Sequence, residues 1–194
     1  MTDIYKLREF VAAMTTLADR NSGNDDAMIE GARPLLATLI SNDEWLPEEF
    51  AKEGQTYRQY LLHCDPHQRF CVVSFVWGPG QTTPIHDHTV WGLIGMLRGA
   101  ERGRRFEFSD GNLIEGEEEL LHMGDIDIVS PTRGDIHLVS NAFTDRTSVS
   151  IHVYGANIGA VRRHVFNPLD GAATDFISGY SNATIPNLWD LSDS

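Results

Sequence analysis

The distribution of apolar residues divides the chain into a helical first part and a strand-rich remainder. Near the N-terminus, apolar residues recur three and four positions apart, at Ile4, Leu7, Phe10, Val11, Met14 and Leu17. This spacing predicts a helix with one apolar face. A second helix is predicted over residues 25–40. Proline and acidic residues in the segment 46–50 predict a further short helical element.

From about Tyr57 onward, short runs rich in Val, Ile, Phe and Trp are separated by Gly, Pro, Asp and Asn. This alternation is typical of an antiparallel all-β body. The candidate strands are residues 69–77, 90–97, 104–108, 118–122, 125–129, 135–140 and 148–154. No repeat or linker separates them, which favours a single domain over 1–194. We expect a helical N-terminal layer, 1–55, packed on a β-barrel or double-sheet sandwich, 56–194.

Composition narrows the classes of partner. The 194 residues are 41% hydrophobic and 22% charged, the balance of a soluble globular protein. Lys and Arg number 15 against 28 Asp and Glu, and this net charge of −13 argues against nucleic acid and anionic membrane surfaces. The charged N-terminus lacks the pattern of a signal peptide and no stretch is apolar enough to span a membrane, so a cytoplasmic location is expected. Cys64 and Cys71 are expected to be reduced thiols.

Two histidines two positions apart, His86 and His88, form the most distinctive polar pattern. Side chains at i and i+2 of a strand share a face, so both imidazoles can bind one metal while Asp87 points away. His137 lies in a second predicted strand, which we expect to cross the barrel and supply a third imidazole. Three imidazoles leave open positions on a six-coordinate metal. Ordinary core or surface roles are expected for His63, His67, His122 and His164.

The spacing around these histidines resembles the two signatures of the cupin superfamily. The matching residues are Gly80, His86, His88 and Gly99 for the first signature, and Gly134, His137 and Asn141 for the second. The glutamate that normally follows the second histidine is absent, with Gly92 and Leu93 in its place. Cupins that keep three histidines without this carboxylate include the thiol dioxygenases, both the cysteine dioxygenase type and its bacterial relatives that act on 3-mercaptopropionate. Further resemblance to them extends over residues 57–62, 75–80, 150–155, 158–163 and 177–182.

This resemblance implies a mainly β, cupin-type (double-stranded β-helix or jelly-roll) barrel with N-terminal helices and with His86, His88 and His137 as metal ligands. Imidazoles bind iron, zinc, copper and nickel, so the ligands alone do not name the metal. The resemblance implies Fe(II), with O₂ as co-substrate, and oxidation of a small-molecule thiol to its sulfinate. Two alternatives stay open: a different metal-binding cupin enzyme, and a non-enzymatic cupin that binds a small ligand or acts as a sensor.

Polar and apolar residues alternate in the predicted strand 148–154. Ser150, His152 and Tyr154 share one face, and the valines and isoleucine between them share the other. The resemblance implies a hydrogen-bonded relay in which Ser150 orients His152, His152 supports Tyr154, and the tyrosine hydroxyl reaches the metal site. The alternative is an exposed amphipathic strand without a catalytic role.

A carboxylated substrate needs a counter-charge, and a guanidinium is the best geometric match. Arg163 matches the position that the bacterial 3-mercaptopropionate enzymes use, whereas Arg162 is expected to face solvent. In cysteine dioxygenases an earlier arginine binds the carboxylate, and the aligned residue here is Gln59, with Arg58 as the alternative if the register slips by one. The resemblance therefore favours 3-mercaptopropionate as substrate, with L-cysteine and cysteamine as alternatives.

The mammalian cysteine enzymes also carry a cysteine, shortly after the histidine pair, that cross-links to the catalytic tyrosine. Gly92 stands near that place here, so Tyr154 is expected to be unmodified. Trp77, Trp91 and Leu93 are expected to fill the core rather than to line the pocket. Association into a homo-oligomer stays open.

Overall fold

Two helices form the first layer of the computed structural model, which describes residues 4–21 and 23–190. They are α1 (Tyr5–Arg20) and α2 (Asp25–Leu39). Asn24 caps α2, because its side-chain oxygen accepts a hydrogen bond from the backbone N–H of Ala27 at 3.1 Å. A short 3₁₀ helix, Glu48–Phe50, replaces the third predicted helix. No helix in these ranges is long and apolar enough to cross a membrane.

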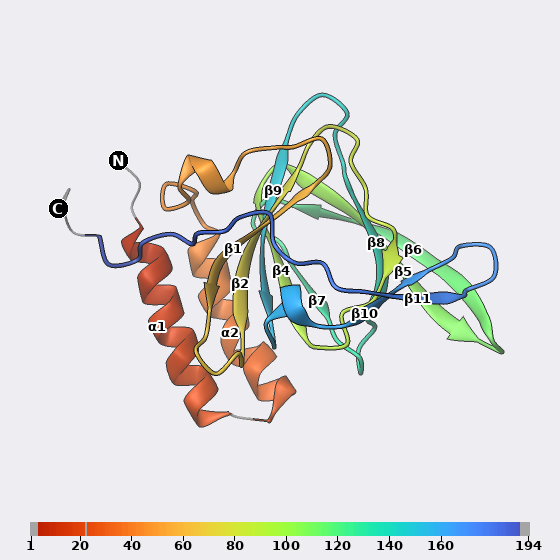
Figure 1. Cartoon of the computed structure of the whole chain (residues 1–194), viewed down its shortest axis with the longest axis horizontal. Coiled ribbons are helices and arrows are strands. Elements are labelled where there is room, and N and C mark those ends of the chain that lie inside the picture. The colour runs from red at the N-terminus through yellow and green to blue at the C-terminus, as the bar shows by residue number, and fades with distance from the viewer. Residues whose placement is uncertain (1–3, 22, 191–194) are drawn as a thin grey trace.

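Eleven described strands build two antiparallel sheets beside the helices (Figure 1). The five-stranded sheet has the order β1-β2-β9-β4-β7, and the six-stranded sheet has the order β11-β10-β3-β8-β5-β6. This architecture confirms the prediction of a mainly β fold with N-terminal helices. The strands are β1 (Arg58–Cys64), β2 (Cys71–Trp77), β3 (Ile85–His86), β4 (Gly92–Arg98), β5 (Ala100–Ser109), β6 (Asn112–His122), β7 (Ile126–Val129), β8 (Ile136–Asn141), β9 (Ser148–Tyr154), β10 (Arg163–Phe166) and β11 (Ala173–Phe176).

The five-stranded sheet separates two cores. On its outer face, residues such as Val149, Ile151 and Val153 pack with the helices. On its inner face, Tyr154 packs with apolar residues from β2, β4, β7 and β8 in the interior between the sheets. All seven residues of β9 are therefore buried, although only one face is apolar. Trp77, Trp91 and Leu93 lie in these cores, as predicted.

Four strands were absent from the predicted set, namely β1, β3, β10 and β11. The predicted strands 104–108 and 118–122 are longer in the structure, where β5 and β6 form a hairpin joined by Asp110 and Gly111, both with positive φ. Salt bridges join Arg102 and Arg104 to acidic residues of β6 along this exposed hairpin. The helices end before residue 55 and the strands begin after it; the single-domain assignment over 1–194 stays a prediction.

The segment after β11 returns across the front of β1 toward the helices (Figure 1). It is fixed to β1 by hydrogen bonds between Ser181 and Gln59 and between Asn182 and Leu61. This return places residues 178–182 beside the interior of the strand-built body.

Candidate metal centre and polar relay

Three histidines from two neighbouring strands point to one place. His86 ends β3, His88 follows it two residues later, and His137 lies on β8. Their ring centroids are 4.8 to 4.9 Å apart, and one ring nitrogen from each lies within 4.8 Å of the others. His137 is the direct cross-strand partner of His86. The expectation that its strand crosses the barrel is wrong, because β8 pairs with β3 in the same sheet.

Hydrogen bonds orient two of the rings. His86 Nδ1 lies 3.0 Å from the Pro84 carbonyl oxygen, and His88 Nδ1 lies 3.1 Å from Asp135 Oδ1. Both acceptors require the proton on Nδ1, which leaves Nε2 free to bind a metal. Burial lowers the pKa of His86 to about 3 and lowers that of His137 well below its usual value, so both rings are neutral. Neutral imidazoles are the form that binds metal ions.

The predicted relay residues form a continuous chain of hydrogen bonds inside the barrel. Ser150 Oγ lies 2.7 Å from His152 Nε2, and His152 Nδ1 lies 2.8 Å from the Tyr154 hydroxyl. His152 stacks on Phe75 with a centroid separation of 4.4 Å, and Tyr154 stacks on His88 at 5.4 Å. The second stack brings the tyrosine to the histidine cluster. Burial excludes the alternative of an exposed strand.

Arg163 is a buried cation without a carboxylate partner. Its side chain is 4% exposed, and it forms no ion pair within residues 4–21 and 23–190. One nitrogen donates to Ser178 Oγ at 2.8 Å, the guanidinium lies 4.7 Å from the Phe176 ring centroid, and Nε has no hydrogen-bond partner. Burial lowers the pKa of Arg163, while Tyr154 and nearby acids oppose that shift. Arg162 instead pairs with Asp175 at the surface, as expected.

Gln59 lies beside Arg163 through a shared contact. Its Nε2 donates to Ser178 Oγ at 3.0 Å and to the Gly179 carbonyl at 2.7 Å. Gln59 is buried and lies opposite Phe75, an inner-face residue of β2, whereas Arg58 lies opposite Val76 on the other face. The pairing therefore selects Gln59 over Arg58 as the inward residue.

Three supporting residues were not identified from the sequence. Asp135 lies two positions before His137 and orients the ring of His88. In the predicted strand 135–140 it shares a face with His137, and this was the signal available in the sequence. Asp87 accepts from the backbone N–H of His164 and lies 2.7 Å from its Nδ1, which ties the metal motif to β10 and so to Arg163. Asp87 faces away from the histidine cluster, as expected. No feature of the sequence pointed to Ser178, because only the return of the chain after β11 brings this residue to the site.

Gly92 lies directly opposite Tyr154 on the neighbouring strand. A Cβ atom at this position would be 2.7 Å from the tyrosine Cδ1, closer than atoms in contact can be. The glycine therefore leaves room for the ring to stack on His88. Cys64 and Cys71, the only cysteines of the chain, are cross-strand partners on β1 and β2 and are free thiols.

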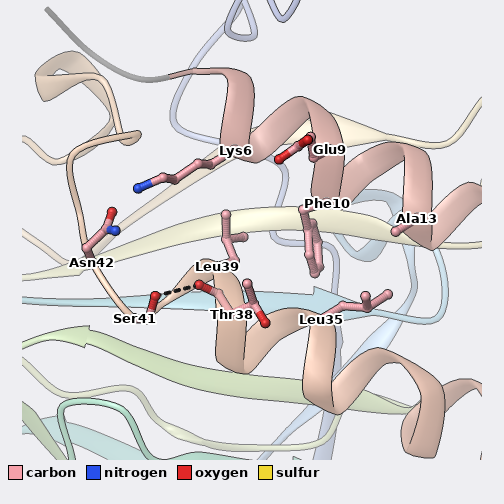
Figure 2. A pocket seen from close by; sticks show the side chains of 9 residues that line it. All are labelled: Lys6, Glu9, Phe10, Ala13, Leu35, Thr38, Leu39, Ser41 and Asn42. Atoms are coloured by element: carbon pink, nitrogen blue, oxygen red, sulfur yellow. Dashed lines mark hydrogen bonds between the residues drawn. The ribbon is translucent and has the colours of Figure 1, made fainter.

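A hollow of about 350 Å³ also lies between the two helices (Figure 2). Phe10 and Leu39 form part of its wall, and no histidine or cysteine lines it. The helices pack on the outer face of the five-stranded sheet, whereas His86 and His137 lie on strands of the other sheet. This hollow is therefore separate from the candidate centre.

Comparison with known proteins agrees with the geometry. The family model described as cysteine dioxygenase type I matches residues 17–165. That range contains the three histidines, the relay and Arg163, whereas Ser178 lies beyond it.

Curated relatives point the same way. Cysteine dioxygenase type 1 of Danio rerio is 26% identical over 137 residues, which are 68% of this chain and 67% of the relative. The Rattus norvegicus protein of that name is 25% identical over 158 residues, covering 79% of this chain and 77% of the relative. Among solved structures, a Klebsiella pneumoniae protein described as having a double-stranded beta-helix domain has a TM-score of 0.46 and 21% identity, covering 58% of this chain and 89% of that chain.

Proposed function

Because the chain belongs to the cysteine dioxygenase type I family, we propose that it oxidises a small carboxylated thiol to its sulfinate, with 3-mercaptopropionate as the preferred substrate. Membership makes the protein a thiol dioxygenase; the choice of thiol is the proposal. The names of the matched relatives favour L-cysteine as the alternative substrate. In either case one thiol and one O₂ yield one sulfinic acid, so atoms balance without an external reductant.

The observation that carries the proposal is the unpaired guanidinium of Arg163. A buried charge without a partner destabilises a protein, so its retention indicates an anionic ligand. A substrate carboxylate matches the planar fork of arginine and would satisfy the unpartnered Nε. Arg163 lies close enough to His86 and Tyr154 for its charge to lower the pKa of both groups. A short thiol held by its carboxylate could thus place its sulfur near the histidines.

The acids beside Arg163 favour a substrate without an amine. Asp87 and Asp135 are the two carboxylates whose charges act on the pKa of Arg163. Both are already engaged, Asp87 with His164 and Asp135 with His88. An ammonium group such as that of L-cysteine would find neither of them free. This arrangement supports 3-mercaptopropionate.

We propose His86, His88 and His137 as the ligands of Fe(II). The geometry fits, because three neutral imidazoles converge and the described metal-binding group contains no carboxylate. Ferrous iron, when bound, supplies the redox chemistry that transfers both atoms of O₂ to sulfur. The protein contributes orientation, since Asp135 fixes one ligand ring and Arg163 would fix the substrate.

The relay would hold a hydroxyl donor at the reacting atoms. Burial raises the pKa of Tyr154, so its hydroxyl stays protonated and can donate a hydrogen bond. His152 holds that hydroxyl, and Ser150 holds His152. We therefore expect Tyr154→Phe to lower kcat while metal content stays unchanged.

The proposal also takes the enzyme to act on free thiols in the cytoplasm. O₂ consumption and sulfinate formation by the Fe(II)-loaded full chain should be measured with 3-mercaptopropionate, L-cysteine and cysteamine. We expect the highest kcat/KM for 3-mercaptopropionate. A higher value for L-cysteine would overturn the substrate proposal and leave the dioxygenase function intact. Bound zinc without thiol-dependent O₂ consumption would instead indicate a different kind of cupin protein.

A further inference from the structure

Glu101 is a buried carboxyl group that the proposed reaction does not use. It lies on β5 between β6 and β8 and is 2% exposed. Its Oε1 has no hydrogen-bond partner, and it forms no ion pair in the described part of the chain. Arg105 lines the same small cavity, of about 30 Å³, but is paired with Asp127. Burial of a carboxyl group without a cation is costly, which indicates that this position serves a purpose.

The carboxyl group of Glu101 meets the relay at its serine end. The Ser150 hydroxyl and the Trp77 indole N–H lie close enough to this carboxyl group to lower its pKa as donors. The same indole N–H points to Ser150 Oγ at 3.3 Å. Ser150 continues to His152, which continues to Tyr154. The polar chain thus runs from Glu101 to the tyrosine that stacks on His88.

We propose that Glu101 is the fourth member of the relay, a positioning residue that sets the direction of its hydrogen bonds. A catalytic role for this direction rests on the proposed dioxygenase function. The arrangement of Glu101, Ser150, His152 and Tyr154 does not depend on it.

Two directions are available to the chain. His152 carries a single ring proton, because burial lowers its pKa well below the usual value. A protonated Glu101 donates to Ser150, Ser150 donates to Nε2, and Nδ1–H donates to the Tyr154 oxygen, which leaves the tyrosine O–H free for the substrate side. An ionised Glu101 accepts from Ser150, so Ser150 accepts from Nε2–H and the tyrosine O–H is donated back to Nδ1. Only the first direction presents a donor to the reacting atoms.

The change of direction falls near neutral pH. Burial raises the pKa of Glu101 to about 7, the donors Ser150 and Trp77 lower it, and the charge of Asp127 raises it. The titratable groups that share its cavity come from β5, β6, β7 and β8: Arg105, Glu119, Asp127 and His137.

The ring protons of His152 report the direction independently of activity. In the full chain, with Zn(II) as a diamagnetic probe, ¹⁵N NMR should show the proton of His152 on Nδ1 at low pH and on Nε2 above pH about 7. In Glu101→Gln, whose amide donates at every pH, the proton should stay on Nδ1. Glu119→Gln, a change in the same cavity, should behave as the wild type. The inference would be overturned if the position of the His152 proton did not depend on pH in the wild type, or if it changed with pH equally in Glu101→Gln.

Kinetics with the Fe(II) enzyme separate this inference from the proposed function. Glu101→Leu should lower kcat about tenfold with unchanged KM and iron content, and Glu101→Gln should restore kcat. If no thiol is oxidised yet the tautomer switches, the proposed function fails and the relay assignment stands. If thiols are oxidised and neither the tautomer nor kcat depends on Glu101, the relay assignment fails alone.

Discussion

Gln59 and Arg163 donate hydrogen bonds to the same hydroxyl, that of Ser178, at 3.0 and 2.8 Å. One comes from β1, the other from β10, and the serine from the returning C-terminal segment. The shared contact fixes the guanidinium, while its Nε keeps no protein partner. This arrangement supports the proposal that both residues face the substrate.

Replacing Arg163 by Ala tests that proposal. Charged hydrogen bonds contribute about 1.5–3 kcal/mol, so kcat/KM for 3-mercaptopropionate should fall about 100-fold, mainly through KM. The loss for cysteamine, which has no carboxylate, should be much smaller. Arg162→Ala, at the exposed neighbour, is the matched control and should leave kcat/KM for all three thiols unchanged. Equal losses for every thiol would remove Arg163 from substrate binding.

The three-histidine site predicts a direct loss of metal in variants. His137→Ala removes one of the three proposed ligands and should leave little bound iron after purification, as measured by elemental analysis. His122→Ala changes an exposed histidine outside the cluster and should retain the full content. Chelator treatment of the wild type should abolish O₂ consumption, and added Fe(II) should restore it. Full metal content in His137→Ala would exclude that residue as a ligand.

Asp135 should tune metal affinity without binding the metal. In Asp135→Asn the acceptor for His88 Nδ1 loses its charge. One of the two oxygens that accept from the backbone N–H groups of His88 and Thr89 is also replaced by an NH₂ group. Loss of such a supporting carboxylate typically weakens metal binding about 10- to 100-fold, which a competition titration with a chelator can measure. Asp26→Asn, at an exposed ion pair of α2 with Arg133, is the control. Unchanged affinity in Asp135→Asn would show that the ring is oriented by other contacts.

The glycine opposite Tyr154 predicts an unmodified tyrosine. Cys64 and Cys71 lie on β1 and β2, and Gly92 occupies the position across from the ring. Mass spectrometry of the purified protein after turnover should therefore find the peptide containing Tyr154 at the mass of its sequence. A cross-linked product with the summed mass of this peptide and a cysteine peptide, less two hydrogens, would contradict this expectation.

The spacing of apolar residues predicted those elements in which apolar side chains are buried and polar side chains face a polar environment. Strand β9 has the predicted bounds, because its alternation suits a strand that packs on helices on one face and on a polar interior on the other. Strand β3 has only two residues, too few for any periodicity, and β11 is largely exposed. These two strands form because neighbouring strands supply their backbone hydrogen bonds, which the sequence of the strand itself does not reveal.

The site shows the same division. The histidines and the relay residues were predictable, since their spacing of two is set by the strand itself. Ser178 and Glu101 reach the site through pairings between distant segments, which no local pattern encodes. The pairing of β8 with β3 was likewise a matter of topology, and it places His137 beside His86.

Glu101 makes a final prediction, for stability. Its pKa in the folded protein, raised by burial to about 7, lies above the ordinary value of 4.5 that the unfolded chain would show. The folded state therefore binds this proton more tightly, and the stability it contributes is present below pH about 4.5 and is lost as pH rises through about 7. Glu101→Gln removes the ionisation but keeps the shape, so it should unfold at a higher temperature than the wild type at pH 8. The free-energy gain should be on the order of 3 kcal/mol and should shrink toward pH 5. Thermal unfolding at both pH values measures it, with the exposed Glu107→Gln as control; a difference from the wild type that does not depend on pH would mean that Glu101 titrates as an ordinary carboxyl.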